Sequence, residues 1–289
     1  MEINRVSDYI RLIGAEAAGY VGNQSFLYRG ESRTDYMLIP SLYREKTVNG
    51  VTSMVYLEDN DERNIIHEFI TEAASFSNSI NIEDSFRWVQ YAQHFGVPTR
   101  LLDWTINPLV ALYFACISNQ DVDGKVYVLQ SESYKQRISD QLSNELNGRS
   151  VEQVANNMIW HEEKGFEFPT IIRPFYFDKR MSAQSSCFMM WGDKKEPFDI
   201  MLKEMEKEKP SLVFRTIVKG DERIIVQEIK SALSEFIVPA NMKNRLLHEL
   251  DAINVNQATL FPGLDGIGKS IEWRNNYFNR EDSSFILML

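Results

Sequence analysis

Residues that could fix the fold covalently or through a metal are scarce in this sequence. Its 289 residues include 2 cysteines and 4 histidines. Cys116 and Cys187 are each flanked by apolar or small residues, which predicts buried, unreactive thiols rather than a redox pair. The histidines are scattered and no cysteine pair has the spacing of a zinc site, so we expect no bound metal.

Long hydrophobic runs are missing as well. No stretch approaches the ~20 apolar residues of a membrane helix, and the opening MEINRVSDYI lacks the apolar core of a signal peptide. Hydrophobic residues make up 44% and charged residues 25%, which is ordinary for a globular chain and argues against extensive disorder. We therefore expect a soluble, cytoplasmic protein without a membrane partner.

Positive charge and phosphate-binding loops are also in short supply. The formal net charge of -10 disfavours nonspecific coating of nucleic acid, although a small cationic pocket for a nucleotide remains compatible with it. Neither GxGxxG nor GxxxxGK[ST] occurs, and the regular alternation of a doubly wound parallel sheet is missing. We predict a single domain over residues 1–289 with an α+β fold, a mixed central sheet and flanking helices.

Hydrophobic periodicity and turn residues place the expected elements. Helices are predicted at 6–20, 61–78 and 88–95, from residue 107 onward, across most of 134–164, at 198–209 and after residue 239. Strands are predicted at 25–28, 125–130, 170–172, 212–218 and 235–238, and 280–289 is either an edge strand or a loose tail. The polar segment 131–165 is expected to be a peripheral helical insertion.

The best-defined boundaries flank a short non-helical connection, residues 97–105. An apolar helical stripe precedes Gly96, which is the expected C-cap because Pro98 blocks continuation of the helix. Downstream, Asn107 and Pro108 supply the N-cap and the first residue of the next helix.

Polar and apolar side chains alternate in the stretch from Gln93 to Thr105. The apolar residues that should anchor it are Leu101, Leu102 and Trp104. The polar residues that must then face a cleft or pair internally are Thr99, Arg100, Asp103 and Thr105. A polar loop held by apolar anchors is a common form of binding site, so this stretch is the first candidate for one.

Purely structural roles are also open for these residues. Asp103 or Thr105 could cap the helix that follows, and Arg100 could pair with Asp103. His94 lies in the last turn of its helix, where an imidazolium suits the helix dipole.

A second polar feature is the tetrapeptide 28–31, Tyr-Arg-Gly-Glu. Arg29 follows a short strand and precedes the permissive Gly30, so its planar fork is well placed to grip a carboxylate or a phosphate. A structural salt bridge from Arg29 to Asp103 or Glu31 is the alternative.

Two later segments carry further polar residues. The first, 180–184, contains Arg180 and Gln184. The second, 261–266, contains Asp265, which is either a turn residue or a site residue.

Together these segments resemble the FRG-domain family, named for a Phe-Arg-Gly motif near its start. The motif is present as Tyr28-Arg29-Gly30, with tyrosine in place of phenylalanine. The family's Pro-Ser-Leu-x-Arg appears at 40–44, and its most distinctive block appears nearly intact as QHFGVPTRLLDWT at 93–105. The block continues through 107–108 and 111–115.

Two more family elements follow in the right order. Arg180 and Gln184 match an Arg-x-x-x-Gln element, and 260–266 matches the closing Leu-Phe-Pro-Asp-Leu-Asp-Gly, with Gly263 in place of aspartate. The resemblance spans roughly residues 20–272. It implies a bacterial or phage-associated module with a role in phage defence.

A weaker resemblance is to arginine-type ADP-ribosyltransferases, in which a strand ending in Tyr-Arg-Gly holds the NAD phosphates. It implies an ADP-ribosyltransferase-like fold, with Arg29 at the phosphates and Thr99 or Thr105 at the nicotinamide ribose. The glutamate of that family's third motif has no clear counterpart, since Gln257 and Glu228 are both poor matches.

Two hypotheses follow for function. In the first, the protein is an enzyme that transfers ADP-ribose from NAD or hydrolyses NAD. Its ligand-binding residues are then Arg29, Gly30, Thr99, Arg100, Thr105 and Gln184, and the residues for proton or charge work are His94, Asp103 and Asp265. In the second, the same cleft is a noncatalytic recognition module for a nucleotide, a nucleic acid or a protein partner.

Overall fold

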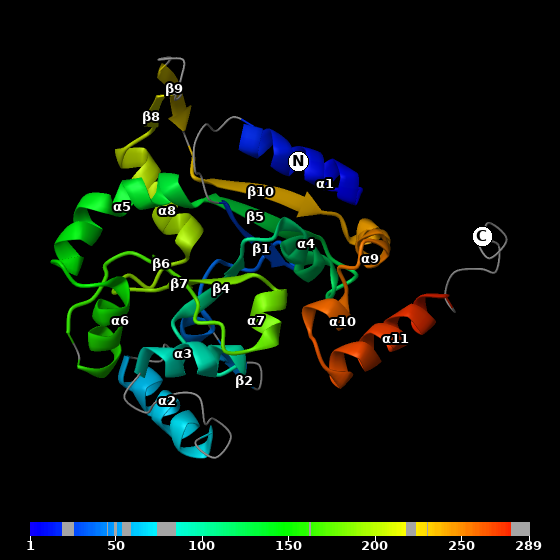
Figure 1. The fold of residues 1–289 in the computed structure, drawn as a ribbon, viewed down its shortest axis with the longest axis horizontal. Helices are drawn as coiled ribbons and strands as arrows, with labels where there is room; N and C mark the ends of the chain where they lie inside the picture. Colours follow the sequence, from blue (N-terminus) through cyan, green and yellow to red (C-terminus); the bar gives the residue numbers. More distant parts are fainter. Residues whose placement is uncertain are drawn as a thin grey trace.

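A six-stranded sheet forms the centre of the protein (Figure 1). The structure is a computed structural model that describes residues 1–18, 26–44, 46–48, 51–53, 59–73, 85–161, 163–217, 224–229 and 231–278. In spatial order the strands are β10 (Leu233–Val238), β5 (Gly124–Gln130), β1 (Phe26–Glu31), β4 (Leu101–Thr105), β7 (Ser186–Met190) and β6 (Thr170–Ile172).

Neighbouring strands of this sheet all run antiparallel. A parallel bridge, Glu2 with Ile237, adds the N-terminal residues to the β10 edge. The predicted α+β class is confirmed, and the sheet is antiparallel where we expected a mixed one, because hydrophobic patterns carry no information about strand direction. Two hairpins stand apart from the sheet: β2 (Lys46–Val48) with β3 (Val51–Ser53), and β8 (Leu212–Ile217) with β9 (Ile224–Ile229).

The stretch predicted as a connection, 97–105, is more regular than expected. Its second half is β4, which lies inside the sheet and pairs with β7, a strand that the sequence did not predict. Leu101 faces one core cluster while Leu102 and Trp104 face another, as alternation along a strand requires. The polar Asp103 in the middle of β4 hides this alternation in the sequence.

Helices surround the sheet. Their bounds are α1 (Val6–Ala18), α2 (Asp59–Ala73), α3 (Ser85–His94), α4 (Pro108–Cys116), α5 (Ser131–Leu146), α6 (Val151–Trp160), α7 (Lys179–Ala183), α8 (Phe198–Glu208), α9 (Lys243–Ala252), α10 (Gln257–Leu260) and α11 (Leu264–Phe278). The polar segment 131–165 contains α5 and α6, whose buried sides join two core clusters. Short 3-10 turns lie at Ser41–Tyr43 and Ala240–Met242. The last two residues of the helix predicted over 6–20 and the segment 280–289 lie outside the described residues.

Local signals end α3 and begin α4 as predicted. Gly96 has a φ of 83°, and the N–H of Val97 donates to the carbonyl oxygen of Ala92, which closes α3 with a left-handed cap. The side chain of Asn107 accepts a hydrogen bond from the N–H of Leu109, with proline at the first helical position of α4. These two caps fix the ends of the connection that contains β4.

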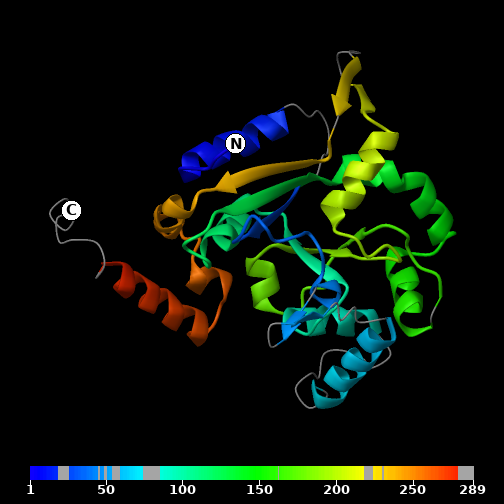
Figure 2. The same ribbon diagram turned by 180° about the vertical axis from the view of Figure 1, so that it is seen from behind.

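Different helices cover the two faces of the sheet (Figures 1 and 2). On one face, α1, α4 and α9 pack over β10, β5 and β1, and α2, α3 and α6 pack over β4, β7 and β6. On the other face, α5 and α8 cover the strands. Tyr28 of β1, which belongs to the first of these clusters, lies opposite Thr105 of β4.

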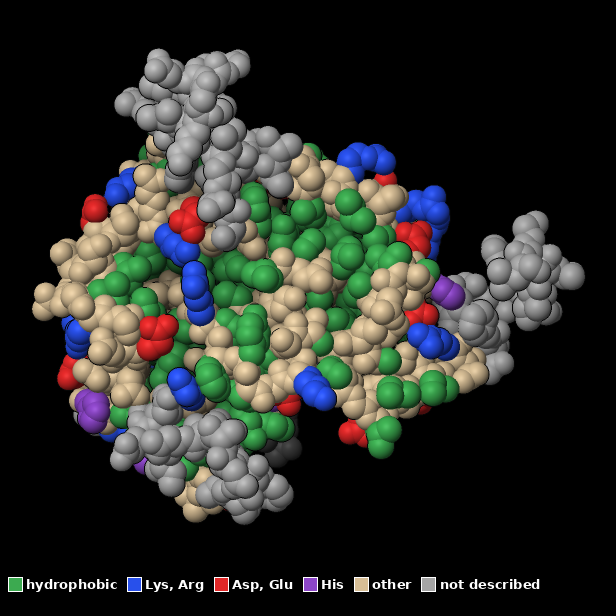
Figure 3. All heavy atoms as spheres, viewed as in Figure 1, with side chains coloured by type: hydrophobic (Ala, Val, Ile, Leu, Met, Phe, Trp, Pro, Cys, Tyr) green, Lys and Arg blue, Asp and Glu red, His purple; other side chains and the backbone are tan. Residues whose placement is uncertain are grey.

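The surface combines apolar and charged areas. In the view of Figure 3, apolar side chains gather over the centre of the molecule and charged side chains lie mostly around them. The C-terminal helix α11 lies at the periphery beside α10 (Figure 1).

Candidate functional site

Strands β1 and β4 make little contact with each other. Among the described residues, Tyr28 opposite Thr105 is the one pair in register along the β1–β4 ladder. The Arg29 side chain bridges the two strands next to this pair. Its guanidinium donates to the backbone oxygen of Asp103 at 2.5 Å, and its Nε donates to Glu31 Oε1 at 2.7 Å. Arg29 is therefore fixed by both strands, with 14% of its side chain exposed.

A cleft of about 330 Å³ opens beside Arg29. Its charged and polar lining comes from several elements, with Arg29 and Glu31 on β1, Gln93 and His94 on α3, Asp103 and Thr105 on β4, and Arg180 and Gln184 on α7 and its C-cap. Helix α4 adds an apolar wall that includes Val110, Phe114 and Ile117. Segments far apart in the sequence thus supply both signs of charge to one opening.

A chain of hydrogen bonds sets the position of Asp103. The N–H of Leu101 donates to Thr99 Oγ1 at 3.2 Å, and the Thr99 hydroxyl donates to Gln93 Oε1 at 2.6 Å. Gln93 Nε2 then donates to Asp103 Oδ2 at 2.7 Å. Thr99 is fully buried, so it acts on the cleft by orienting Gln93 and, through it, the carboxylate of Asp103.

Arg180 is a partly buried cation in the wall of the cleft. Its guanidinium carbon lies 4.5 Å from the centre of the Phe261 ring. Burial lowers the pKa of Arg180, and the nearby carboxylates of Asp103 and Asp178 oppose that shift. Within the described part of the chain, Nε of Arg180 has no hydrogen-bond partner. A guanidinium in this state favours the binding of an anion.

His94 is held in the cleft as a neutral imidazole. Its Nε2 lies 3.7 Å from Asp178 Oδ2, and 9% of its side chain is exposed. Burial lowers the pKa of His94, an effect opposed by Asp178 and Asp103 and increased by Arg180. Since the shift is downward from an ordinary pKa of 6.5, the ring is uncharged at neutral pH.

Three of the predicted site residues do not line the cleft. The side chain of Arg100, predicted as a ligand-binding residue, is 1% exposed, and its Nε donates to Glu62 Oε2 at 2.5 Å inside the core, away from the cleft lining. Asp265 lies exposed in the first turn of α11, outside the cleft. Thr99 is the third, and its burial excludes direct contact with a ligand.

Thr105 and Gln184 do line the cleft, and they are tied to each other. The Thr105 hydroxyl donates to the backbone oxygen of Gln184 at 2.7 Å and accepts from the N–H of Asn107 at 3.0 Å. Gln184 Nε2 donates to the backbone oxygen of Leu260 at 3.1 Å. These bonds link β4, α7 and α10 around the opening.

Gly30 lets β1 pack closely against α4. A Cβ at this position would lie 1.8 Å from the carbonyl oxygen of Ala111, so only glycine fits. Its presence in the lining follows from this close packing.

Sequence reasoning did not assign Gln93, Glu31 and Arg180 to the site. The spacing of Arg180 and Gln184 was available as a signal, because residues four apart on a helical turn lie on the same side. The contacts of Gln93 depend on the fold and had no local signal. The alternative of an Arg29–Glu31 salt bridge is what the structure shows, at 2.7 Å.

We also searched the described residues for a membrane-spanning helix and for a metal-binding group. Among the residues that the structure describes, no helix is both long and apolar enough to cross a membrane. In the same residues, no group of three or more histidine, cysteine, aspartate or glutamate side chains is arranged to hold a metal ion.

A comparison with protein families finds a match. The family model described as FRG domain matches residues 24–124, which include β1, α3, β4 and α4. Neither the search of curated proteins nor the search of solved structures returned a match. Arg29, Gln93, His94 and Asp103 of the cleft all lie in the matched segment. Residues 24–124 therefore match an FRG domain, and most of the lining of the candidate site comes from this segment.

Proposed function

We propose that the cleft binds a nucleotide-type small molecule through its phosphate groups. The observation that carries this proposal is the partly buried Arg180, whose Nε is unsatisfied within the described residues. A guanidinium nitrogen that has lost water without gaining a hydrogen-bond partner is costly, and phosphate oxygens can bind a guanidinium at two points. Arg29 of β1 adds a second guanidinium to the lining of the cleft.

The apolar part of the cleft supports the nucleotide assignment. Phe114 lines the cleft, and its ring meets that of Phe261 edge to face with ring centres 6.1 Å apart. A planar base or nicotinamide ring can pack against Phe114. The cleft volume of about 330 Å³ lies at the lower end of the range for small-molecule sites, which suits a mononucleotide or part of a dinucleotide.

NAD is the first substrate to test within this proposal. In hydrolysis, the bond between ribose C1′ and the nicotinamide nitrogen breaks and its electrons leave with nicotinamide. Water adds to C1′ and gives up a proton, which the neutral His94 can accept. The Asp103 carboxylate, oriented by Gln93, would stabilise the positive charge that develops on the ribose. ADP-ribosyl transfer follows the same course with a target nucleophile in place of water.

One observation favours a second function, noncatalytic recognition. Both carboxylates of the cleft already accept hydrogen bonds, Glu31 from Arg29 and Asp103 from Gln93. A pocket preformed in this way can hold a nucleotide, a nucleic-acid end or a group on a protein without turning it over.

Binding measurements test the phosphate contact directly. In calorimetric titrations with ADP-ribose, NAD and AMP, we expect Arg180→Ala to weaken binding roughly ten- to a hundredfold, the worth of charge-assisted hydrogen bonds to phosphate. Arg33→Ala is the matched control, because Arg33 is an exposed arginine paired with Asp35 and lies outside the cleft. Equal affinities for wild type and Arg180→Ala would contradict the proposal.

Nicotinamide release separates the two functions. If the site is catalytic, wild-type protein releases nicotinamide from NAD and Asp103→Asn loses most of this activity while it still binds ADP-ribose. Tight binding of NAD with no release by wild type would instead support recognition alone.

We extend the proposal to phage defence, on the basis of the FRG resemblance. The test is plating efficiency of phage on bacteria that express the protein. Protection by wild type that is lost in Arg180→Ala and kept in Arg33→Ala would support it, and equal plating on all strains would count against it.

A further inference from the structure

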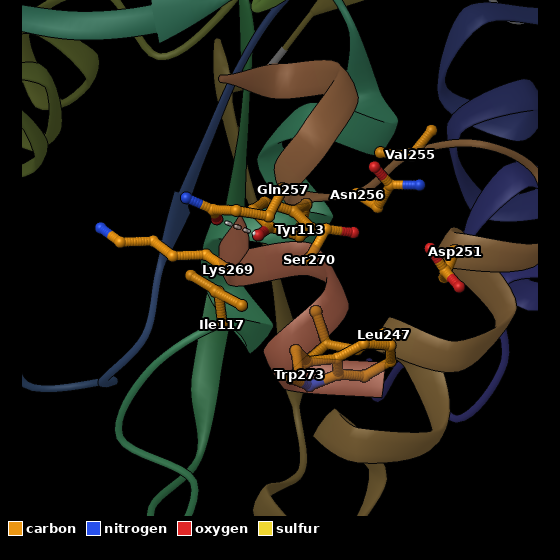
Figure 4. Close-up of a pocket in the computed structure, with 10 residues that line it drawn as sticks. All are labelled: Tyr113, Ile117, Leu247, Asp251, Val255, Asn256, Gln257, Lys269, Ser270 and Trp273. Carbon is orange, nitrogen blue, oxygen red and sulfur yellow. Dashed lines mark hydrogen bonds between the residues drawn. The ribbon is translucent and has the colours of Figure 1, made fainter. Parts of the chain in front are cut away.

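A second cavity of about 280 Å³ lies beside α4 and shares Ile117 with the lining of the cleft. Its walls come from α4, α9, α10 and α11, which enclose it together with the connection at Val255 (Figure 4). The apolar side chains in these walls include Ile117 from the C-cap of α4, Leu247 from α9 and Trp273 from α11. An apolar hollow with a tryptophan in its wall suits a flat ring.

One polar atom in the cavity lining is unsatisfied. Ser270 of α11 is 3% exposed, and within the described residues its Oγ has no hydrogen-bond partner. A buried hydroxyl without a partner is unfavourable, so native structures seldom keep one unless a ligand or water completes it. The hydroxyl can both donate and accept, so the group that completes it can be either a hydrogen-bond acceptor or a donor.

The charged groups at the cavity do not call for a charged ligand. Asp251 accepts two hydrogen bonds from Arg274, at 2.9 and 3.1 Å. The Lys269 side chain extends away from the other lining residues (Figure 4). The Tyr113 hydroxyl donates to Gln257 Oε1 at 2.6 Å, and burial raises the pKa of Tyr113, so it stays neutral.

We propose that this cavity is a second binding site, for a neutral planar compound of one or two rings that carries a hydroxyl or amide group. The ring would pack against Trp273 and Leu247, and its polar group would hydrogen-bond Ser270. The volume allows this size, because a cavity of roughly 150 Å³ already admits benzene. The inference does not depend on the function proposed for the cleft.

The stability of two serine variants tests the premise. Ser270→Ala removes an unsatisfied hydroxyl from a helix, so we expect the ligand-free variant to melt about 1–2 °C above wild type. Ser133→Ala is the matched control, because Ser133 is also buried in a helix and donates to Gln130 at 3.2 Å. It should melt below wild type. A lower melting temperature for Ser270→Ala would show that Ser270 is satisfied and would overturn the premise.

Phenol and toluene serve as a matched pair of probes for the binding site. By ligand-observed NMR titration, we expect phenol to bind wild type, and to bind Ser270→Ala roughly three- to tenfold more weakly, as loss of one hydrogen bond predicts. Toluene should bind both proteins alike. Arg180→Ala should leave phenol binding unchanged, which separates this cavity from the cleft even though Ile117 lines both.

Three outcomes would overturn the proposal. They are no binding of either probe to wild type, equal phenol affinity for wild type and Ser270→Ala, and loss of phenol binding in Arg180→Ala. The last would place the probe in the cleft.

Discussion

Arg100 and Glu62 form an ion pair that is closed off from solvent, with 1% and 0% of their side chains exposed. Glu62 also accepts the backbone N–H of Arg100 at 2.8 Å, so one carboxylate from α2 fixes both the side chain and the backbone at the start of β4. Removal of one partner from such a pair leaves a buried, uncompensated charge, which costs more than the pair itself contributes.

We expect Glu62→Ala to lower the free energy of unfolding by about 3–5 kcal/mol, measured by urea denaturation. Asp35→Ala is the control, because the Arg33–Asp35 pair is solvent-exposed, and it should cost at most about 1 kcal/mol. Similar small losses in both variants would show that the Arg100 charge finds water or another anion when Glu62 is removed.

The neighbours Arg100 and Asp103 show where residue-level prediction succeeds and fails. Both stand in one polar stretch, and the sequence indicates that each must be paired or exposed. It does not indicate which, because the partner of Arg100 lies 38 positions earlier and the partner of Asp103, Gln93, lies in the preceding helix. Whether each of these side chains is buried in an ion pair or exposed in the cleft depends on residues distant in the sequence, and no local sequence pattern identifies them.

At the scale of elements, the contact of β1 with α4 determines one side of the cleft. Gly30 brings the strand so close to the helix that an added methyl group would overlap the Ala111 carbonyl, at 1.8 Å. The next residue in sequence, Glu31, and the previous one, Arg29, owe their positions in the opening to this approach.

Gly30→Ala should therefore destabilise the protein by about 1–3 kcal/mol or more, since the backbone on both sides must shift. Gly14→Ala is a matched control: Gly14 lies in α1 with no atom within 4 Å of its added Cβ, so this variant should gain about 0.5–1 kcal/mol. Thermal and urea unfolding of the two variants provide the comparison. If Gly30→Ala is as stable as wild type, β1 and α4 are less tightly packed than described.

Helix ends that are marked by capping residues could be predicted from the sequence, whereas strands that depend on pairing with another strand could not. Gly96 and Asn107 mark the end of α3 and the start of α4 because caps depend on residue type within one turn. The strands β4 and β7 were harder, since each has five residues and owes its strand conformation to pairing with the other. Strands β1 and β4 pair at one position, Tyr28 opposite Thr105, and the cleft lies beside this short pairing. Neither strand's sequence indicates that the pairing is so short.

At the scale of the whole molecule, the two cysteines report on different parts of the core. Cys116 belongs to the cluster under α4, and Cys187 to the cluster on the opposite face of the sheet. Burial raises the pKa of Cys116 to about 12 and that of Cys187 to about 11, so neither thiol is nucleophilic in the folded protein. This fits the expectation of buried thiols from their apolar neighbours in the sequence.

Both thiols should react with an aromatic disulfide reagent only when the protein unfolds globally. We expect a single slow labelling rate at pH 8 that rises with urea in parallel for the two sites, measured by mass spectrometry of labelled peptides. Faster labelling of one cysteine would show that its half of the sheet opens independently of the other.

The sheet ends on one side at β6, which has three residues, and on the other at β10. At the β10 edge, the N–H of Ile237 donates to the carbonyl oxygen of Met1, and the carbonyl oxygen of Ile237 accepts from the N–H of Ile3. The first residues of the chain therefore occupy hydrogen-bonding positions that another polypeptide would need in order to add a strand. The edge strand β6 is therefore short, and the hydrogen-bonding groups of the edge strand β10 are partly paired with the N-terminal residues. Together with a net charge of -10, this disposes the folded protein against strand-by-strand aggregation when it is concentrated.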